Sequence, residues 1–360
     1  MKTMISILMI STALFFAGCT DADMEDNGPG MPGEENPGGE WLIPENEVRD
    51  GGPGKDGIPA INNPSFIKAS EVTYLNDNDL VLGFADGDDL RAYPHKILDW
   101  HEIINDDTPN HSMAVIYCPL TGTGIGWDRE INGMKTTFGV SGLLYNSNII
   151  PYDRATNSNW SQLLLKSVNG NRKGTDAKTF NLLETSWKTW KAMYPNSKII
   201  SAKTGYNRSY NTYPYGNYKS NTNLLFPVSN SDMRLHPKKR MLAIINDGKA
   251  AGFTFNEAAS GITVQQAGFD NKSYVVASNF EANFMVAFNA VLNDGTKLSF
   301  SAVPNQLPII LEDDEGNNWD VFGRAVSGPR EGQKLVPVPQ MMGYWFAFAA
   351  FYPDIHLESF

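Results

Sequence analysis

Residues 81–93 read VLGFADGDDLRAY, and residues 241–253 read MLAIINDGKAAGF. The two stretches align without a gap, and in each of them apolar residues flank an Asp-Gly dipeptide. Asp-Gly suits a tight hairpin turn, because glycine adopts a positive φ without strain. Both stretches therefore predict a β-hairpin.

The hairpins belong to a longer internal repeat. Three further pairs of segments match in the same order along the chain: 131–138 with 292–300, 153–160 with 313–319, and 187–195 with 345–353. Such an order predicts two homologous halves, residues 58–205 and 235–360, joined by a Tyr/Asn-rich linker at 206–234.

Other local patterns complete the predicted fold. Short apolar runs indicate strands at 114–119 and 135–140, and helix signals occur at 94–104 and 183–193. In the second helix, aromatic residues at i, i+3 and i+7 form one face, which we expect to lie in the core. The sequence thus predicts a strand-dominated α+β fold with short helices packed on the sheets.

The N-terminus has the pattern of an export signal. Residues 1–18 contain a basic residue, Lys2, and a short apolar run that is too short to span a membrane comfortably. The small residues before Cys19 resemble a bacterial lipobox, which predicts lipidation of Cys19. We expect the protein in the bacterial cell envelope, lipid-anchored to a membrane (outer membrane, periplasmic or surface-facing). The alternative is an ordinary secretory signal that contains a cysteine.

The negative charge of the chain is concentrated near this cysteine. The 360 residues include 40 acidic and 29 basic ones, a net charge of −11. Residues 20–57 hold eleven acidic and two basic residues and are rich in glycine and proline. We therefore expect residues 19–57 to be a lipidated N-terminus and a flexible tether. Because the rest is nearly neutral, no nucleic-acid partner is expected.

The repeat also separates positions that serve the fold from candidate functional positions. Features present in both halves most simply serve the fold. Residues 93–107 and 117–126 carry polar and sulfur-containing side chains that the second half lacks. We therefore expect the functional site in the first half and regard the second half as degenerate.

An enzymatic hypothesis places the site around the second cysteine. Cys118 would be a nucleophile or redox thiol, and His101 its base. Glu102, Asp106 and Ser141 would be supporting groups. The glycine-rich turn after Cys118 could stabilise an anion with its amides.

Two alternatives use the same region. Cys118, His101 and His95 offer sulfur and imidazole ligands suited to copper or zinc, so a metal-binding or small-ligand-binding protein without turnover is the second hypothesis. The third is an envelope interaction module in which Cys118 is only a core residue, since free cysteine is often buried.

Five segments of the body resemble a known family. They are 58–64 (IPAINNP), 100–106 (WHEIIND), 117–124 (YCPLTGTG), 138–147 (FGVSGLLYNS) and the run from Asp153 to Gln162. Together they resemble the bacterial domain-of-unknown-function family numbered 3179, over about residues 58–360. The resemblance implies an exported or lipid-anchored bacterial protein and no established activity. Family members often have Cys-Pro-Leu-Cys where this chain has Thr121 last, so a dithiol mechanism does not carry over.

Overall fold

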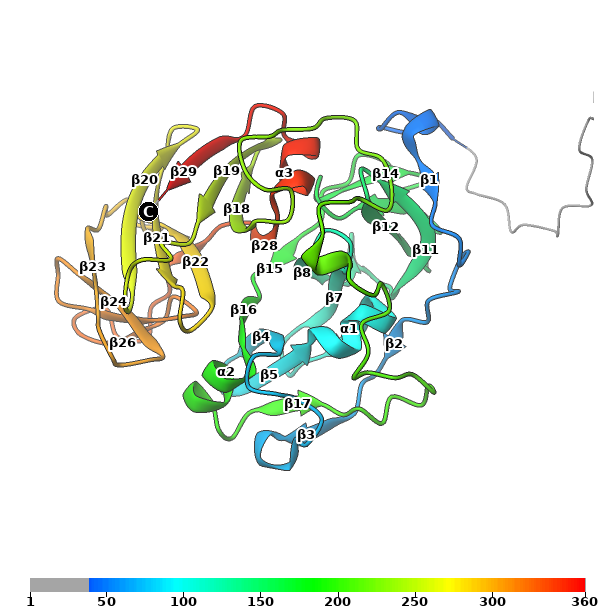
Figure 1. Cartoon of the computed structure of the whole chain (residues 1–360). Coiled ribbons are helices and arrows are strands. Elements are labelled where there is room, and N and C mark those ends of the chain that lie inside the picture. The colour runs from blue at the N-terminus through cyan, green and yellow to red at the C-terminus, as the bar shows by residue number, and fades with distance from the viewer. Residues whose placement is uncertain (1–38, 360) are drawn as a thin grey trace, which may run out of the picture. The chain divides into compact units, whose positions relative to one another are not determined.

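The computed structural model describes residues 39–359. The predicted signal segment, Cys19 and the first part of the predicted tether lie outside these residues. Within the described residues, strands dominate and the α-helices number three, so the predicted strand-dominated α+β class is confirmed (Figure 1). No helix within residues 39–359 has the length and hydropathy needed to cross a membrane.

The first half and the segment before it form three five-stranded sheets and one small hairpin. The first sheet has the order β16 (Leu183–Ser186), β4 (Leu80–Asp86), β5 (Asp89–Pro94), β17 (Lys198–Ile200) and β3 (Phe66–Lys68). The second has the order β15 (Thr179–Phe180), β8 (Thr123–Asp128), β7 (Ser112–Cys118), β6 (Ile103–Asp107) and β2 (Ile61–Asn62). The third has the order β1 (Arg49–Asp50), β11 (Phe138–Tyr145), β12 (Asn148–Asp153), β13 (Asn159–Ser161) and β14 (Lys166–Asn169). The hairpin joins β9 (Glu130–Ile131) to β10 (Met134–Lys135).

The second half forms three four-stranded sheets. One has the order β28 (Gln340–Tyr344), β18 (Arg240–Asn246), β19 (Lys249–Thr254) and β29 (His356–Ser359). Another has the order β20 (Thr263–Phe269), β21 (Lys272–Asn279), β22 (Phe284–Asn289) and β27 (Val336–Pro337). The last has the order β23 (Phe300–Ala302), β24 (Ile309–Asp313), β25 (Asn318–Asp320) and β26 (Ala325–Ser327).

The strand orders of the halves correspond. The order β16-β4-β5-β17 in the first half matches β28-β18-β19-β29 in the second, and the last strand of each set runs parallel to its neighbour. The indole nitrogen of Trp160 donates to Asp153, and that of Trp319 donates to Asp313 in the same way. These correspondences agree with the predicted repeat, while descent of both halves from one ancestral unit stays a prediction.

Both hairpins expected from the opening segments form. β4 pairs with β5 and β18 with β19, and Gly87 and Gly248 in the turns have positive φ. Gly83 in β4 is also required, because a side chain there would collide with the ring of Trp190. Close approach of backbone to an aromatic ring is a common reason for glycine inside a strand.

The helices are shorter than the sequence predicts. They are α1 (His95–His101), α2 (Trp187–Met193) and α3 (Trp345–Phe351). The first four residues of the expected helix 183–193 form β16 instead, because they pair with β4. Ser186 then caps α2 by accepting a hydrogen bond from the Thr189 amide. Trp187 and Trp190 are buried, which confirms the expected aromatic core face.

The prediction of a flexible tether is wrong for residues 39–57. β1 adds to the edge of β11, and Ile43 is buried against Ile150 and Val168. Asp56 forms an ion pair with Arg154 at 2.6 Å. The acidic, glycine-rich composition suggested a solvated chain, yet a few apolar residues and one strand pairing attach it to the body.

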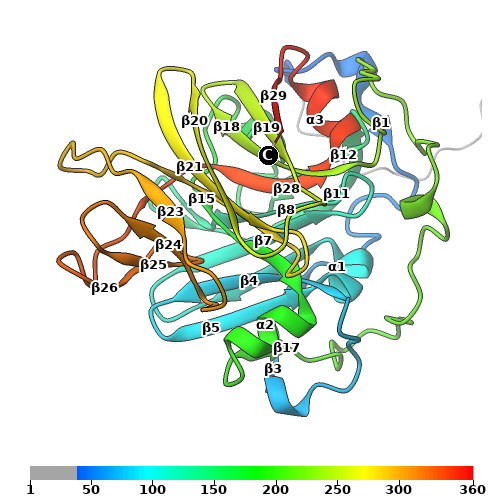
Figure 2. The ribbon, with the colours of Figure 1, turned by 60° about the vertical axis from the view of Figure 1, so that its left-hand side comes forward.

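The two halves share one core. Apolar residues of α3, β18 and β28 join those of β7, β8 and β11 in a single cluster. β28 lies beside β8, as Figure 2 shows, and the Tyr344 amide donates to the Thr121 carbonyl at 2.8 Å. The second half therefore supports the turn that follows Cys118.

Candidate functional site

Cys118 is the last residue of β7 and is completely buried. Its thiol lies 3.7 Å from the Ser147 carbonyl, to which it donates. Burial, together with the nearby charge of Glu102, raises the pKa of the thiol to about 11. At pH 7 only about one molecule in 10⁴ would carry a thiolate. In this conformation Cys118 is a buried neutral thiol.

His101, the last residue of α1, is held by other partners. Its Nδ1 lies 2.7 Å from the Pro59 carbonyl, so this nitrogen donates. Its Nε2 lies 2.8 Å from the hydroxyl of Tyr210, which therefore donates to the ring. Burial lowers the pKa of the imidazole. The predicted pair of Cys118 and His101 is not formed, because both ring nitrogens are engaged elsewhere.

Glu102 occupies an unusual position between α1 and β6. It ends the helix with φ 57° and ψ −35°, a conformation that L residues rarely adopt. The backbone is fixed on both sides, since its amide donates to Leu98 at 2.8 Å and its carbonyl accepts from Tyr117 at 2.8 Å. The packing of α1 against β7 thus forces the side chain inward.

The carboxyl group of Glu102 is almost completely buried, with 3% of the residue exposed. Its hydrogen-bond partner among residues 39–359 is the Tyr215 hydroxyl, 3.5 Å from Oε1. Burial raises the pKa of this carboxyl to about 8, and the charge of Asp99 acts in the same direction. Glu102 is therefore mainly protonated at pH 7 and can donate a hydrogen bond.

A cavity of about 180 Å³ lies beside this carboxyl. Its walls come from the N-terminal segment, the turn after β7, strand β11, the start of β12 and the linker. Apart from Glu102 and Tyr215, the lining is apolar or glycine: Gly51, Pro53, Ile58, Leu120, Val140, Gly142, Leu143, Leu144, Ile149 and Phe226. A protonated carboxyl group in an apolar cavity is a typical ligand-anchoring arrangement.

The linker covers the site rather than only connecting the halves. The hydroxyl of Tyr213 donates to the Pro119 carbonyl at 3.2 Å, directly after Cys118. Tyr218 is buried, and the ammonium group of Lys238 donates to its carbonyl. The linker, whose sequence looks like a solvated connector, therefore packs on the first half through Tyr213 and Tyr218 and contributes Tyr215 and Phe226 to the cavity wall.

A buried polar network, which was not predicted from the sequence, fixes the glycine-rich turn. Thr123 donates to the side chain of Gln162 at 2.6 Å, and Asn148 donates to the same oxygen at 2.7 Å. Gln162 in turn donates to the carbonyls of Ile116 and Thr123. Gln162 is the last residue of the family-like segment from Asp153 to Gln162. This membership is the sequence feature that could have pointed to the network. The network orients the end of β7 and thereby Cys118.

The glycine at the turn has a physical reason. Gly122 has φ 63°, and a side chain there would collide with Arg240 and the ring of Tyr344. Its carbonyl accepts a hydrogen bond of 2.7 Å from Arg240 Nη1. Arg240 also pairs with the buried carboxylate of Glu184, whose pKa falls to about 2 because the charges and hydrogen bonds of Arg240 and His95 together outweigh its desolvation.

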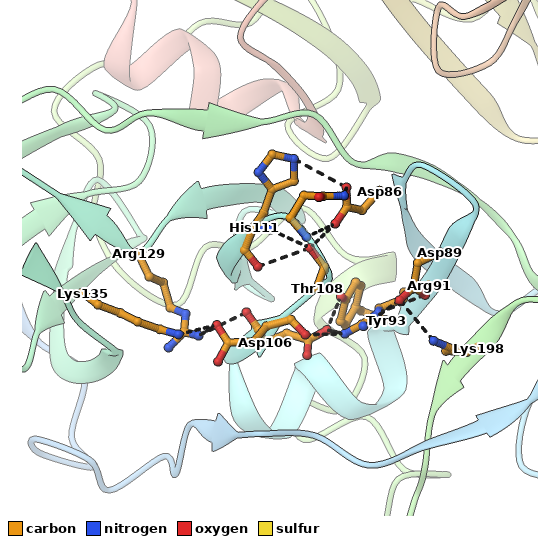
Figure 3. Close-up of polar contacts among 12 residues, drawn as sticks. Asp86, Asp89, Arg91, Tyr93, Asp106, Thr108, His111, Arg129, Lys135 and Lys198 are labelled. Atoms are coloured by element: carbon orange, nitrogen blue, oxygen red, sulfur yellow. Dashed lines mark hydrogen bonds and ion pairs between the residues drawn. The ribbon is translucent and has the colours of Figure 1, made fainter. Parts of the chain in front are cut away.

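Two predicted supporting groups lie elsewhere. Asp106 accepts hydrogen bonds of 2.7 Å from Arg91 and from the Tyr93 hydroxyl, in a polar network at the edge of β4 to β7 (Figure 3). Ser141 donates to the Ile150 carbonyl and accepts from the Leu143 amide at 3.0 Å, where β11 is irregular. Both side chains stabilise strands, and neither contacts Cys118 or His101.

The predicted metal ligands are also separate. The ring of His95 packs on Tyr117 with centroids 4.5 Å apart, and its Nε2 lies 3.3 Å from Glu184. His101 faces Pro59 and Tyr210 instead. Among residues 39–359, no group of three or more His, Cys, Asp or Glu side chains is arranged to hold a metal ion. The copper or zinc hypothesis thus gains no support from the geometry.

Comparison with known proteins bears on the family alone. Neither the curated proteins nor the solved structures give a match. A family model described as "Protein of unknown function (DUF3179)" matches residues 55–355. This range includes every residue lining the Glu102 cavity except Gly51 and Pro53. The chain therefore belongs to the DUF3179 family.

Proposed function

We propose that this protein binds a small, mainly apolar molecule in the Glu102 cavity, and that a lipid on Cys19 holds it at a membrane of the bacterial envelope. The main observation behind this proposal is the buried, protonated carboxyl group of Glu102, which faces an apolar cavity. A neutral carboxyl donates one hydrogen bond, so the ligand would present an acceptor such as a hydroxyl, ether or carbonyl oxygen.

The cavity sets the size of the ligand. Its volume of about 180 Å³ is close to the ~150 Å³ of an engineered apolar cavity that binds benzene. A ligand with one ring or a short branched chain would fit. The backbone strain at Glu102 supports a functional role, since such strained conformations cluster at binding and catalytic sites.

A binding role fits the geometry better than thiol catalysis does. The pKa of Cys118 is raised to about 11, and no described base contacts its sulfur. A nucleophilic cysteine needs a lowered pKa or an adjacent base. Cys118 instead packs among the apolar side chains next to the cavity.

Calorimetric titration of the full chain with anisole, whose ether oxygen can accept but not donate a hydrogen bond, at several pH values tests the binding proposal. Binding should be strongest below pH 8 and weaken about tenfold per pH unit above it, because ionised Glu102 no longer donates. Glu102→Gln should bind without this pH dependence, and Ile149→Trp should fill the cavity and abolish binding. Toluene, which lacks an acceptor, should bind more weakly than anisole.

The matched control is Glu130→Gln, which changes an exposed glutamate outside the cavity. It should bind like the wild type at every pH. The proposal fails if anisole does not bind, or if Ile149→Trp binds it as well as the wild type. The anchor is tested separately, by mass spectrometry of the mature N-terminus and by the release of Cys19→Ala from the membrane fraction.

A further inference from the structure

A second cavity, of about 200 Å³, lies where the two halves meet. β16 of the first half lies beside β22 of the second (Figure 1). The apolar walls include Phe84 from β4, Phe180 from β15, and Val286 and Phe288 from β22. None of these residues belongs to the Glu102 cavity. Because the walls come from both halves, the second cavity exists only when the halves are packed together.

Two cationic side chains, Arg324 and Lys334, line this cavity, whose other walls are mainly apolar with three uncharged polar residues, Thr179, Asn181 and Gln340. The two cationic residues lie opposite each other on neighbouring segments, joined by an isolated antiparallel bridge. No carboxylate among residues 39–359 forms an ion pair with either side chain. Asp320, four residues before Arg324, interacts electrostatically with both cations, but its carboxylate accepts hydrogen bonds from the amides of Phe322 and Arg324, at 2.8 and 2.9 Å, and not from their side chains.

One atom of the cavity lacks a partner. Nη2 of Arg324 is buried and makes no hydrogen bond with any described residue. A buried guanidinium N–H without an acceptor is unfavourable, and such a group calls for an explanation. Outside the cavity lining, the hydroxyl of Tyr194, on which the charges of Asp320 and Arg324 act, is also buried without a partner among the described residues. An anionic ligand group at this end of the cavity would supply the missing acceptor.

We propose that this cavity binds a compact monocarboxylate with an apolar tail, independently of the Glu102 cavity. The carboxylate would accept from Arg324, whose planar fork matches a carboxylate with two hydrogen bonds, and would be attracted by Lys334. The tail would contact Phe84, Phe180, Val286 and Phe288. The volume limits the ligand to about ten non-hydrogen atoms, the size of phenylacetate.

The test is calorimetric titration of the full chain with phenylacetate, phenylacetamide and inorganic phosphate. Phenylacetate should bind at least tenfold more tightly than its neutral amide, because only the carboxylate compensates the two cations. It should also bind at least tenfold more tightly than phosphate, which cannot fill the apolar walls. Arg324→Met should weaken phenylacetate at least tenfold, and Val286→Trp should abolish its binding.

Controls separate this site from the first and from misfolding. Lys249→Met removes an exposed lysine that pairs with Asp270, and it should bind phenylacetate like the wild type. Ile149→Trp, which fills the Glu102 cavity, should also leave phenylacetate binding unchanged. If Arg324→Met fails to fold, Arg324→Gln and Val286→Trp carry the same test. Absence of binding to the wild type, equal affinity for acid and amide, or phosphate binding as tightly as phenylacetate would overturn the proposal.

Discussion

Replacing Glu102 by glutamine should change how the stability of the protein depends on pH. Burial raises the pKa of this carboxyl from 4.5 to about 8 in the folded state. Between these two values the folded protein holds a proton that the unfolded chain has released. The free energy of unfolding contributed by Glu102 therefore falls as the pH rises.

The size of the effect follows from this pKa difference. Each pH unit inside the window lowers the contribution by about 1.4 kcal/mol, and the loss between pH 5.5 and 7.5 is about 2.5 kcal/mol. Glutamine has a similar shape and cannot ionise. Relative to the wild type, Glu102→Gln should therefore gain about 2.5 kcal/mol of stability over the same two pH units.

Urea unfolding of both proteins at pH 5.5, 6.5 and 7.5, followed by tryptophan fluorescence, measures this difference. Other titrating groups act on both proteins alike, so the comparison isolates position 102. Glu130→Gln, at an exposed glutamate, should run parallel to the wild type. If Glu102→Gln also ran parallel, Glu102 would ionise normally in the folded protein, and the reasoning from its burial would be refuted.

Three further predictions concern the surroundings of the cavity. Cys118 should resist iodoacetamide in the native protein and react in urea, as mass spectrometry would reveal; rapid native alkylation would contradict its complete burial. Arg240→Met should lower the free energy of unfolding by about 3 kcal/mol, because Glu184 would stay buried without the Arg240 cation. Adding Glu184→Gln to this variant should recover part of the lost stability, and equal losses in the single and double variants would argue against the pairing. Gly122→Ala should cost at least about 2 kcal/mol of stability in the same urea assay, because the turn needs a positive φ and has no room for a methyl group; a neutral substitution would show that the turn can relax.

Local sequence signals predicted the hairpins and the aromatic helix face well. Residues 81–93 contain both strands and their turn, so the pattern depends on neighbours in the chain. Residues 183–186 were wrongly expected to be helical because their strand partner, β4, lies about a hundred positions earlier. Long-range pairing of this kind overrides local propensity and has no mark within a short window.

The site was predicted only in part. Glu102 was named as a supporting group, but its importance depends on a cavity whose walls come from residues 51–58, 140–149 and 215–226. The linker looked solvated because its composition is polar, but the fold buries Tyr218 and partly buries Tyr210, Tyr213 and Tyr215. His101 and Cys118 are close in sequence and lie on adjacent elements, yet the backbone turn at Glu102 directs His101 toward Pro59.

The central claim is that Glu102 is a protonated ligand-binding group in an apolar cavity. A ¹³C NMR titration of its side-chain carboxyl, assigned with Glu102→Gln and repeated with saturating anisole, tests this claim most directly. We predict an inflection near pH 8 without the probe, and a higher value with it, because the ligand favours the protonated form. An inflection near pH 4.5, or one that saturating anisole leaves unchanged, would contradict the claim.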